Sequence, residues 1–391
     1  MSAIAYTTAQ QAKKRTGGAS LQAPTSELTV FVDLGSSCTK TFYAIGENAH
    51  FAFLPPEIAI VSQNRLSEFF AANETAAPID TLWLELGDGE PITVGRLAET
   101  FRGDSLIARR KVDPGLFRIL GTIGGIRDTF SLPSPLTVNL GIALPAAEYA
   151  DRKILQEKLA GVTKLICRGR ELQITWGSID CQLEGAGLIR ERRARLQNVG
   201  APSKIVSLML GHRNASLLIY EGSSIQVEKC RSDGPGFFVA TDLAARLLGQ
   251  EPSTPGLTEA IAAQSQSLRI QGRGFKPIDI SSAVAEARTG YWQQVRSFLE
   301  SYLPAGQFDL VCGGGAAWAM RSELRELAAE IGIKVSFAEE LQQQLRDILS
   351  FHGGSEDELG ENLKLLQMAD AFIGFQALVA KQRRRQQRVS E

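Results

Sequence analysis

The sequence lacks the cysteine and histidine patterns of a cross-linked or zinc-bound protein. Its five cysteines are scattered along the chain without a C-x-x-C pair, which favours reduced thiols over a disulfide framework. The three histidines, His50, His212 and His352, lie far apart and do not have the spacing of zinc ligands. We therefore expect neither disulfides nor a zinc site.

Long apolar runs and an excess of charge of one sign are also missing. No apolar stretch approaches the roughly 20 residues that span a bilayer, and the N-terminus lacks the apolar core of a signal peptide. The net charge is -1, so any contact with nucleic acid would have to be local. These absences predict a soluble, cytoplasmic protein with no membrane partner.

Length and composition are those of a globular protein with more than one core. The chain has 391 residues, of which 44% are hydrophobic and 22% charged, and this predicts two domains or a large split fold. Residues 1–26 are polar, rich in small side chains and carry the basic cluster Lys13-Lys14-Arg15. Because such a segment buries too little apolar area to order itself, we predict a flexible N-terminal arm.

A strand–turn–strand near the N-terminus carries the clearest chemistry. Asp33 ends an apolar strand, Gly35-Ser36-Ser37 forms a polar turn, and Lys40 opens a second strand. Backbone N–H groups, small hydroxyls and a nearby cation suit a phosphate chain, and the carboxylate would hold waters around Mg²⁺. An ordinary β-hairpin is the alternative reading of this segment alone.

The remaining segments mix hairpins with helices, so the chain is not a simple alternating parallel sheet. Strands are expected at 136–144 and 308–312, and helices at 148–159, 241–248, 258–267 and 280–303. A strand–turn–strand pattern occurs near Asp33 and again near Gly211, which indicates an internal duplication.

The common phosphate motifs do not explain these loops. The sequence contains no G-x-x-x-x-G-K-[ST] segment, which excludes a P-loop. The glycines at 313–315 lie between a strand and a helix, but Trp318 occupies a position at which a dinucleotide motif needs a small residue. A dinucleotide fold, with Glu339 or Glu340 at the ribose, and a plain helix-start turn stay open as alternatives.

Five motifs in a fixed order provide a more specific indication. The segments VDLGSSCTK, LGIALPAAEY, LMLGHRNAS, DLVCGGGAAW and QMADAFIGFQAL, between Leu28 and Leu378, together resemble the actin/Hsp70/sugar-kinase superfamily, and within it the ParM/StbA-type actin-like plasmid segregation proteins. The resemblance implies an α/β, actin-like two-domain fold of duplicated ribonuclease-H-like domains with a nucleotide cleft between them. It places the first domain at 27–160 with an insertion at about 50–130, the second at 161–350, a helix returning to the first domain at 351–380, and a basic tail at 381–391.

The resemblance also assigns roles to residues. Asp33, Gly35, Ser36, Ser37 and Lys40 match the first phosphate loop, with Asp33 near the metal. Glu148 matches a residue that orients the attacking water, although a helix-start glutamate is an equal alternative. Gly313, Gly314 and Gly315 match the adenosine motif, where any Cβ would clash with the nucleotide.

The second phosphate loop departs from the family pattern. Met209 stands where the family has an acidic residue two positions before the glycine, and Gly211, Arg213 and Asn214 follow it. Arg213 or Asn214 would contact phosphate unless this segment is simply a polar turn. Because methionine cannot assist metal or water, nucleotide binding is a firmer expectation than hydrolysis.

The function implied by the resemblance is a weak ATPase, with Glu148 and Asp33 as catalytic residues, that binds ATP (or GTP) with Mg²⁺ and polymerises with itself. Such a filament would move or position plasmid DNA through a DNA-binding adaptor protein. A small-molecule kinase of the same fold and a non-hydrolysing nucleotide-dependent scaffold are the alternatives. The basic tail would bind DNA, an adaptor or an acidic neighbour, or remain a solvated end.

Overall fold

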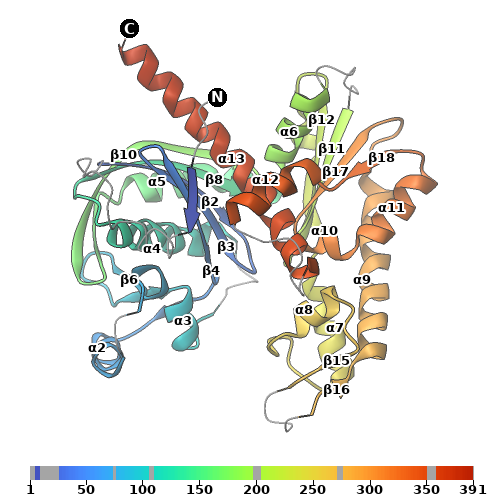
Figure 1. Ribbon diagram of the computed structural model, residues 1–391, viewed down its shortest axis with the longest axis horizontal. Coiled ribbons are helices and arrows are strands. Elements are labelled where there is room, and N and C mark those ends of the chain that lie inside the picture. The colour runs from blue at the N-terminus through green and yellow to red at the C-terminus, as the bar shows by residue number, and fades with distance from the viewer. Residues whose placement is uncertain are drawn as a thin grey trace. The chain divides into compact units, whose positions relative to one another are not determined.

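The computed structural model divides the chain into two compact units (Figure 1). One unit comprises Met1–Leu183 with Ala371–Glu391, and the other comprises Glu184–Asp370. The residues that the structure describes are 5–8, 26–73, 76–104, 110–196, 204–270, 276–349 and 358–390.

The first unit is built on one large mixed sheet. Its strands follow the order β1-β4-β3-β2-β8-β10-β9-β6-β7-β5. They are β1 (Ala5–Thr8), β2 (Glu27–Leu34), β3 (Thr39–Ile45), β4 (Asn48–Leu54), β5 (Ile58–Ile60), β6 (Leu82–Glu85), β7 (Ile92–Val94), β8 (Leu136–Leu144), β9 (Lys164–Cys167) and β10 (Arg170–Leu183). Strands β2 and β3 are antiparallel, whereas β8 runs parallel to both β2 and β10.

Helices of the first unit bury both faces of its central strands. They are α2 (Gln63–Ala72), α3 (Arg96–Thr100), α4 (Val112–Phe130), α5 (Arg152–Ala160) and the part of α13 (Glu358–Ser390) from Ala371 onward, with short 3-10 turns η1 (Pro78–Asp80) and η2 (Ala146–Asp151). Strands covered on both faces lose the alternation of polar and apolar residues, and seven of the eight residues of β2 are buried. Glycines let α4 approach the strands closely, because a Cβ on Gly125 would lie 2.3 Å from Leu82 Cδ2.

The second unit contains a smaller sheet with the order β13-β12-β11-β17-β18, and β14 also pairs with β12. Its strands are β11 (Lys204–Leu210), β12 (Asn214–Glu221), β13 (Ser224–Ile225), β14 (Arg231–Pro235), β17 (Asp309–Gly313) and β18 (Lys334–Ser336), with a separate small hairpin of β15 (Ser267–Leu268) and β16 (Ile278–Asp279). Its helices are α6 (Ala186–Leu196), α7 (Phe238–Leu248), α8 (Leu257–Ala262), α9 (Ser281–Tyr302), α10 (Gly315–Ala319), α11 (Arg321–Glu330), α12 (Glu339–Leu349) and the first part of α13 (Glu358–Ser390), with the 3-10 turn η3 (Val227–Lys229).

The two sheets repeat one topology. In the first unit, the antiparallel hairpin β2–β3 has the parallel strands β8 and β10 beside β2. In the second unit, the antiparallel hairpin β11–β12 has the parallel strands β17 and β18 beside β11. This repeat is the internal duplication that the two similar sequence patterns indicate.

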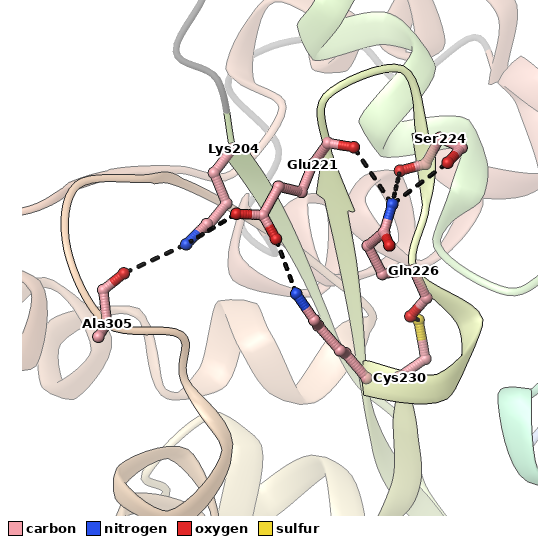
Figure 2. A network of polar contacts seen from close by, with 7 residues as sticks. Lys204, Glu221, Ser224, Gln226, Cys230 and Ala305 are labelled. Carbon is pink, nitrogen blue, oxygen red and sulfur yellow. Dashed lines mark hydrogen bonds and ion pairs between the residues drawn. The ribbon is translucent and has the colours of Figure 1, made fainter.

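Polar contacts close the end of the second hairpin (Figure 2). Glu221, the last residue of β12, forms ion pairs with Lys204 at 3.3 Å and with Lys229 at 2.9 Å. The Gln226 amide donates to the Glu221 carbonyl and to Ser224, and Lys204 donates to the Ala305 carbonyl at 3.2 Å. These exposed contacts fix the hairpin end opposite the β11–β12 turn.

Helix α13 is long and apolar because much of it is core. By length and composition, Gly360–Arg388 is the one described helix that could cross a membrane, and 67% of its most apolar window is buried inside the protein. Phe375 stacks on Phe42 of β3 at 5.9 Å. The expectation that no apolar stretch approaches such a length was therefore wrong, and packing on the sheet accounts for this stretch.

The unit boundaries differ from the predicted ranges. Residues 170–183 belong to the first unit because β10 pairs with β8 along its length, whereas the resemblance implied a boundary at residue 160. Within the predicted N-terminal arm, Ala5–Thr8 form β1 and pair with β4. Residues 1–4 and 9–25, including the Lys13-Lys14-Arg15 cluster, lie outside the described residues.

Candidate functional site

The first predicted loop lies at the carboxyl edge of parallel strands. Asp33 near the end of β2 is in register with Ala143 near the end of β8, and η2, which contains Glu148, begins directly after Pro145. The structure therefore brings Glu148 to the same sheet edge as the loop that follows Asp33. Ligands of open α/β sheets bind at this edge, outside the carboxyl ends of the strands.

Gly35 is required by the shape of the loop. A Cβ at this position would lie 2.4 Å from the Cys38 carbonyl oxygen, which no side chain tolerates. Ser36 is half-buried and Ser37 is exposed, so the Ser37 side chain is accessible from solvent. The β2–β3 hairpin thus makes a tight turn that carries small hydroxyl side chains.

Asp33 and Lys40 form a buried ion pair across the mouth of the hairpin. They are register partners, and Lys40 Nζ lies 2.6 Å from Asp33 Oδ2. Burial by itself would raise the pKa of Asp33, but the charges of Lys40, Lys111 and Arg118 outweigh it and hold the pKa below its ordinary value. Asp33 is therefore an ionised carboxylate at neutral pH.

Arg118 of α4 supports the loop from within the protein. Its Nη2 donates to the Gly35 carbonyl at 2.7 Å, and its Nε donates to Thr39 Oγ1 at 2.8 Å. Only 2% of Arg118 is exposed, and burial lowers its pKa to about 10. The guanidinium group remains charged at neutral pH and joins both ends of the turn, because Gly35 precedes Ser36 and Thr39 opens β3.

Lys111 and Glu148 complete the cluster. The Lys111 amide donates to Glu148 Oε2 at 2.5 Å, and both residues are buried. The Lys111 charge acts on Asp33, which places that cation near the loop as well. The buried group therefore carries three cations, Lys40, Lys111 and Arg118, beside the carboxylates of Asp33 and Glu148, and the half-buried Glu57 also acts on Arg118. Cations of this kind bind phosphate oxygens through charge-assisted hydrogen bonds.

The residues fit a magnesium ion that is held mainly through waters and phosphate. Asp33 Oδ1 is a buried oxygen with no hydrogen-bond partner among the described residues. No group of three or more His, Cys, Asp or Glu side chains that could hold a metal ion occurs within those residues. Mg²⁺ needs no such cluster, because it keeps several waters and binds one or two carboxylates together with substrate phosphates.

In the second unit, the two remaining loops lie side by side. Strands β11 and β17 are parallel, with Met209 in register with Gly313. Gly314 has a φ of 87°, and a Cβ there would lie 2.3 Å from the Leu210 carbonyl oxygen. Gly314 is therefore needed for close packing against β11, which is a structural reason for it beside the predicted contact with a nucleotide; a Cβ on Gly315 would instead lie 3.3 Å from Gln367 Nε2.

The β11–β12 turn is fixed by polar contacts of its own. The Gly211 amide donates to the Asn214 carbonyl at 3.0 Å, and the Asn214 side-chain amide donates to Ser216 Oγ and to the Ser232 carbonyl. Asn214 therefore has a structural role in the hairpin. A Cβ on Gly236 would lie 2.1 Å from the Arg213 carbonyl carbon, so the backbone that carries Arg213 packs tightly against the next segment.

Met209 is a packing residue in this structure. Only 3% of it is exposed, and a Cβ on Gly313 would lie 2.6 Å from its Sδ atom. The thioether fills the space between β11 and the glycine segment. It supplies no charge at the position where the family pattern has a carboxylate.

Sequence reasoning missed three buried charged residues. Arg118 and Lys111 approach the first loop from α4 and the residue before it, and neither belongs to a recognisable motif. Asp370 of α13 accepts hydrogen bonds from the Gly185 and Gly187 amides at 2.9 and 2.8 Å, which caps the start of α6. Asp370 lies within the segment QMADAFIGFQAL, so the fifth motif is the signal that could have drawn attention to it.

Two duplicated sheets, each with a turn and loops at the carboxyl edge of its parallel strands, define an actin-like fold. No protein-family model matches the chain, and a comparison with curated protein sequences finds no match. The fold is nevertheless shown by solved structures.

The actin-like protein Alp7A is similar at a TM-score of 0.62 and 14% identity, with 92% of this chain and 99% of that chain covered. ParM from a 15-stranded filament of Clostridium botulinum is similar at a TM-score of 0.58 and 12% identity, covering 90% and 99%. Bacillus thuringiensis ParM with AMPPNP is similar at 0.59 and 11%, covering 92% and 100%. The fold is that of ParM-type actin-like proteins.

Proposed function

We propose that this chain binds a nucleoside triphosphate with Mg²⁺ and assembles with itself into filaments that move or position plasmid DNA. The observation that carries the proposal is the buried cluster of Lys40, Lys111, Arg118 and Asp33 around the first loop, on a fold shared with ParM. One solved ParM structure contains AMPPNP and another is a filament.

The residues of the first loop would each contact a different part of the nucleotide–metal complex. The backbone amides of the turn and the hydroxyls of Ser36 and Ser37 would donate to phosphate oxygens, with Lys40 as counter-charge. Asp33 would hold the waters of Mg²⁺ through Oδ1, and the metal would supply charge neutralisation between phosphates. Arg118 would keep the turn in shape without touching the ligand.

The remaining predicted residues would serve the base and the reaction. Gly313, Gly314 and Gly315 would lie against the sugar and base, with Gly211 and Arg213 at the second phosphate loop. Glu148, whose carboxylate is fixed by the Lys111 amide, would orient the attacking water. ATP and GTP would both fit this set of residues.

Filament formation follows from the symmetry of the expected contact. A head-to-tail contact between copies that does not close on itself generates a helical polymer. We propose that such a polymer acts in the cytoplasm on plasmid DNA through a DNA-binding adaptor protein. The one described helix that is long and apolar enough to span a membrane is largely buried inside the protein, which supports a role without a membrane.

Nucleotide binding and assembly can be tested with a variant that spares the core. Ser37→Asp adds a negative charge to an exposed position of the loop, so it should abolish ATP binding and ATP-dependent pelleting while leaving unfolding unchanged. Ser223→Asp, in the exposed turn after β12, is the matched control and should behave as wild type. Pelleting that is the same with ATP, GTP, ADP and no nucleotide would refute the proposal.

A non-hydrolysing, nucleotide-dependent scaffold is the second candidate, and Met209 favours it. A buried thioether replaces the expected carboxylate and packs on Gly313. In that case wild-type filaments would form with ATP and release no phosphate, and Met209→Asp would be the variant to restore release. Phosphate release by the wild type would rule this candidate out.

A further inference from the structure

The last turns of α13 are strongly basic. From Ala371 to Ser390 the sequence contains no Asp or Glu, whereas Lys381, Arg383, Arg384, Arg385 and Arg388 all fall within it. The structure continues the helix to Ser390. Figure 1 shows this red end of α13 projecting beyond the sheet of its own unit.

One side of this helix end is attached to the first unit. Lys381 Nζ lies 2.8 Å from both carboxylate oxygens of Asp180 on β10. The Gln382 amide donates to Ser178 Oγ at 2.9 Å, and the Gln386 amide donates to Glu27 Oε2 at 3.3 Å. These contacts hold the helix and neutralise Lys381.

The arginines are spread around the helix. Successive residues of an α-helix are about 100° apart, so Arg384 lies about 200° from Gln382, whereas Arg385 and Arg388 lie within about 40° of the direction of Lys381. Arg383, Arg384, Arg385 and Arg388 are exposed, and none of them forms an ion pair with another described residue. Their charge is therefore presented to solvent.

We propose that this exposed end of α13, Arg383–Arg388, binds the phosphate backbone of double-stranded DNA directly. Arginine presents a planar set of donors that binds phosphate oxygens in pairs, and an α-helix fits the DNA major groove. A membrane surface fits less well, because interfacial helices need an apolar face and residues 381–388 contain only Lys, Gln and Arg. The inference does not depend on nucleotide binding or polymerisation.

The test measures binding of the full-length protein to a fluorescent random-sequence DNA duplex, without nucleotide, over a series of salt concentrations. The logarithm of the binding constant falls as the logarithm of the salt concentration rises, and each arginine that no longer neutralises a phosphate should make this negative slope shallower by about 0.9. The variant Arg384→Gln/Arg385→Gln/Arg388→Gln should therefore reduce the magnitude of this slope by about 3 and weaken DNA binding at least about tenfold. The matched control Arg65→Gln/Arg190→Gln/Arg269→Gln removes the same charge from exposed positions elsewhere and should bind as wild type.

Further measurements distinguish DNA binding by this helix end from a general attraction to anions. The single variant Arg388→Gln, at an exposed position near the helix end, should lower the slope by about 1 even if the triple variant folds poorly. Equal decreases in affinity in the tail variant and the control, or no duplex binding by the wild type, would overturn the proposal. So would tighter binding to phosphatidylserine vesicles or to polyglutamate than to the duplex. Pelleting with ATP, measured in parallel, should not change in the tail variant.

Discussion

Replacement of Arg118 would test whether a buried guanidinium shapes the phosphate loop. Arg118 donates to the Gly35 carbonyl and to Thr39 Oγ1. Hydrogen bonds that involve a charged group each contribute about 1.5–3 kcal/mol, so the two acceptors together account for roughly 3–6 kcal/mol. Against this stands the burial of the charge, which lowers the pKa from 12.5 to about 10. That shift corresponds to about 3 kcal/mol.

The difference between these terms gives the expected effect. Arg118→Met removes the donors and also the cost of burying the charge, so we expect a decrease of about 1–2 kcal/mol in unfolding free energy. Arg118→Lys keeps the burial cost but cannot reach both acceptors with one ammonium group. It should therefore be no more stable than Arg118→Met, although it conserves the charge.

The assays are denaturant unfolding and titration with a fluorescent ATP analogue. Because the loop amides lose their support, both variants should weaken nucleotide binding by about tenfold, which corresponds to about 1.4 kcal/mol. Arg190→Met, at an exposed position of α6, is the control and should change neither measurement. Wild-type stability and affinity in Arg118→Lys would refute the reasoning, because it would show that charge alone suffices.

Three further predictions concern single residues. Gly314→Ala should lower the free energy of unfolding by more than about 3 kcal/mol, because Gly314 has a φ of 87° and a Cβ there would clash with the Leu210 carbonyl. Gly222→Ala is the control: Gly222 has a φ of 66° but open space around it, so this variant should lose only about 1 kcal/mol in the same denaturant unfolding assay. Burial lowers the pKa of His212 from 6.5, so as pH falls below that value the unfolded chain takes up the proton first and stability declines; His212→Gln should flatten this part of a stability-against-pH curve, and an unchanged slope would contradict the assignment. Asp370→Asn should cost about 1–2 kcal/mol through the weakened cap of α6, and an unaltered unfolding midpoint would argue against that cap.

Local patterns in the sequence were sufficient for the strands and turns of the candidate site. The apolar run ending at Asp33, the Gly-Ser turn and Lys40 predicted the hairpin that β2 and β3 form, and the strand at 136–144 was placed at the bounds of β8. The glycines at 313–315 were correctly placed between a strand and a helix. The actin-like fold was predicted from the order of these segments. The strands and turns depend on residues close together in the chain, whereas the fold was inferred from the order of segments between Leu28 and Leu378.

Tertiary structure alone decided which distant charges meet at the loop and where one unit gives way to the other. Arg118 reaches Thr39 across 79 positions of sequence, and Asp370 reaches Gly185 across 185. The hydrophobic periodicity of the sequence does not identify such pairs, because a buried charge is stabilised by whichever partner the folded chain brings to it. The membership of β10 in the first unit was hidden for the same reason, because local sequence predicts a strand but does not identify β8 as the strand with which β10 pairs.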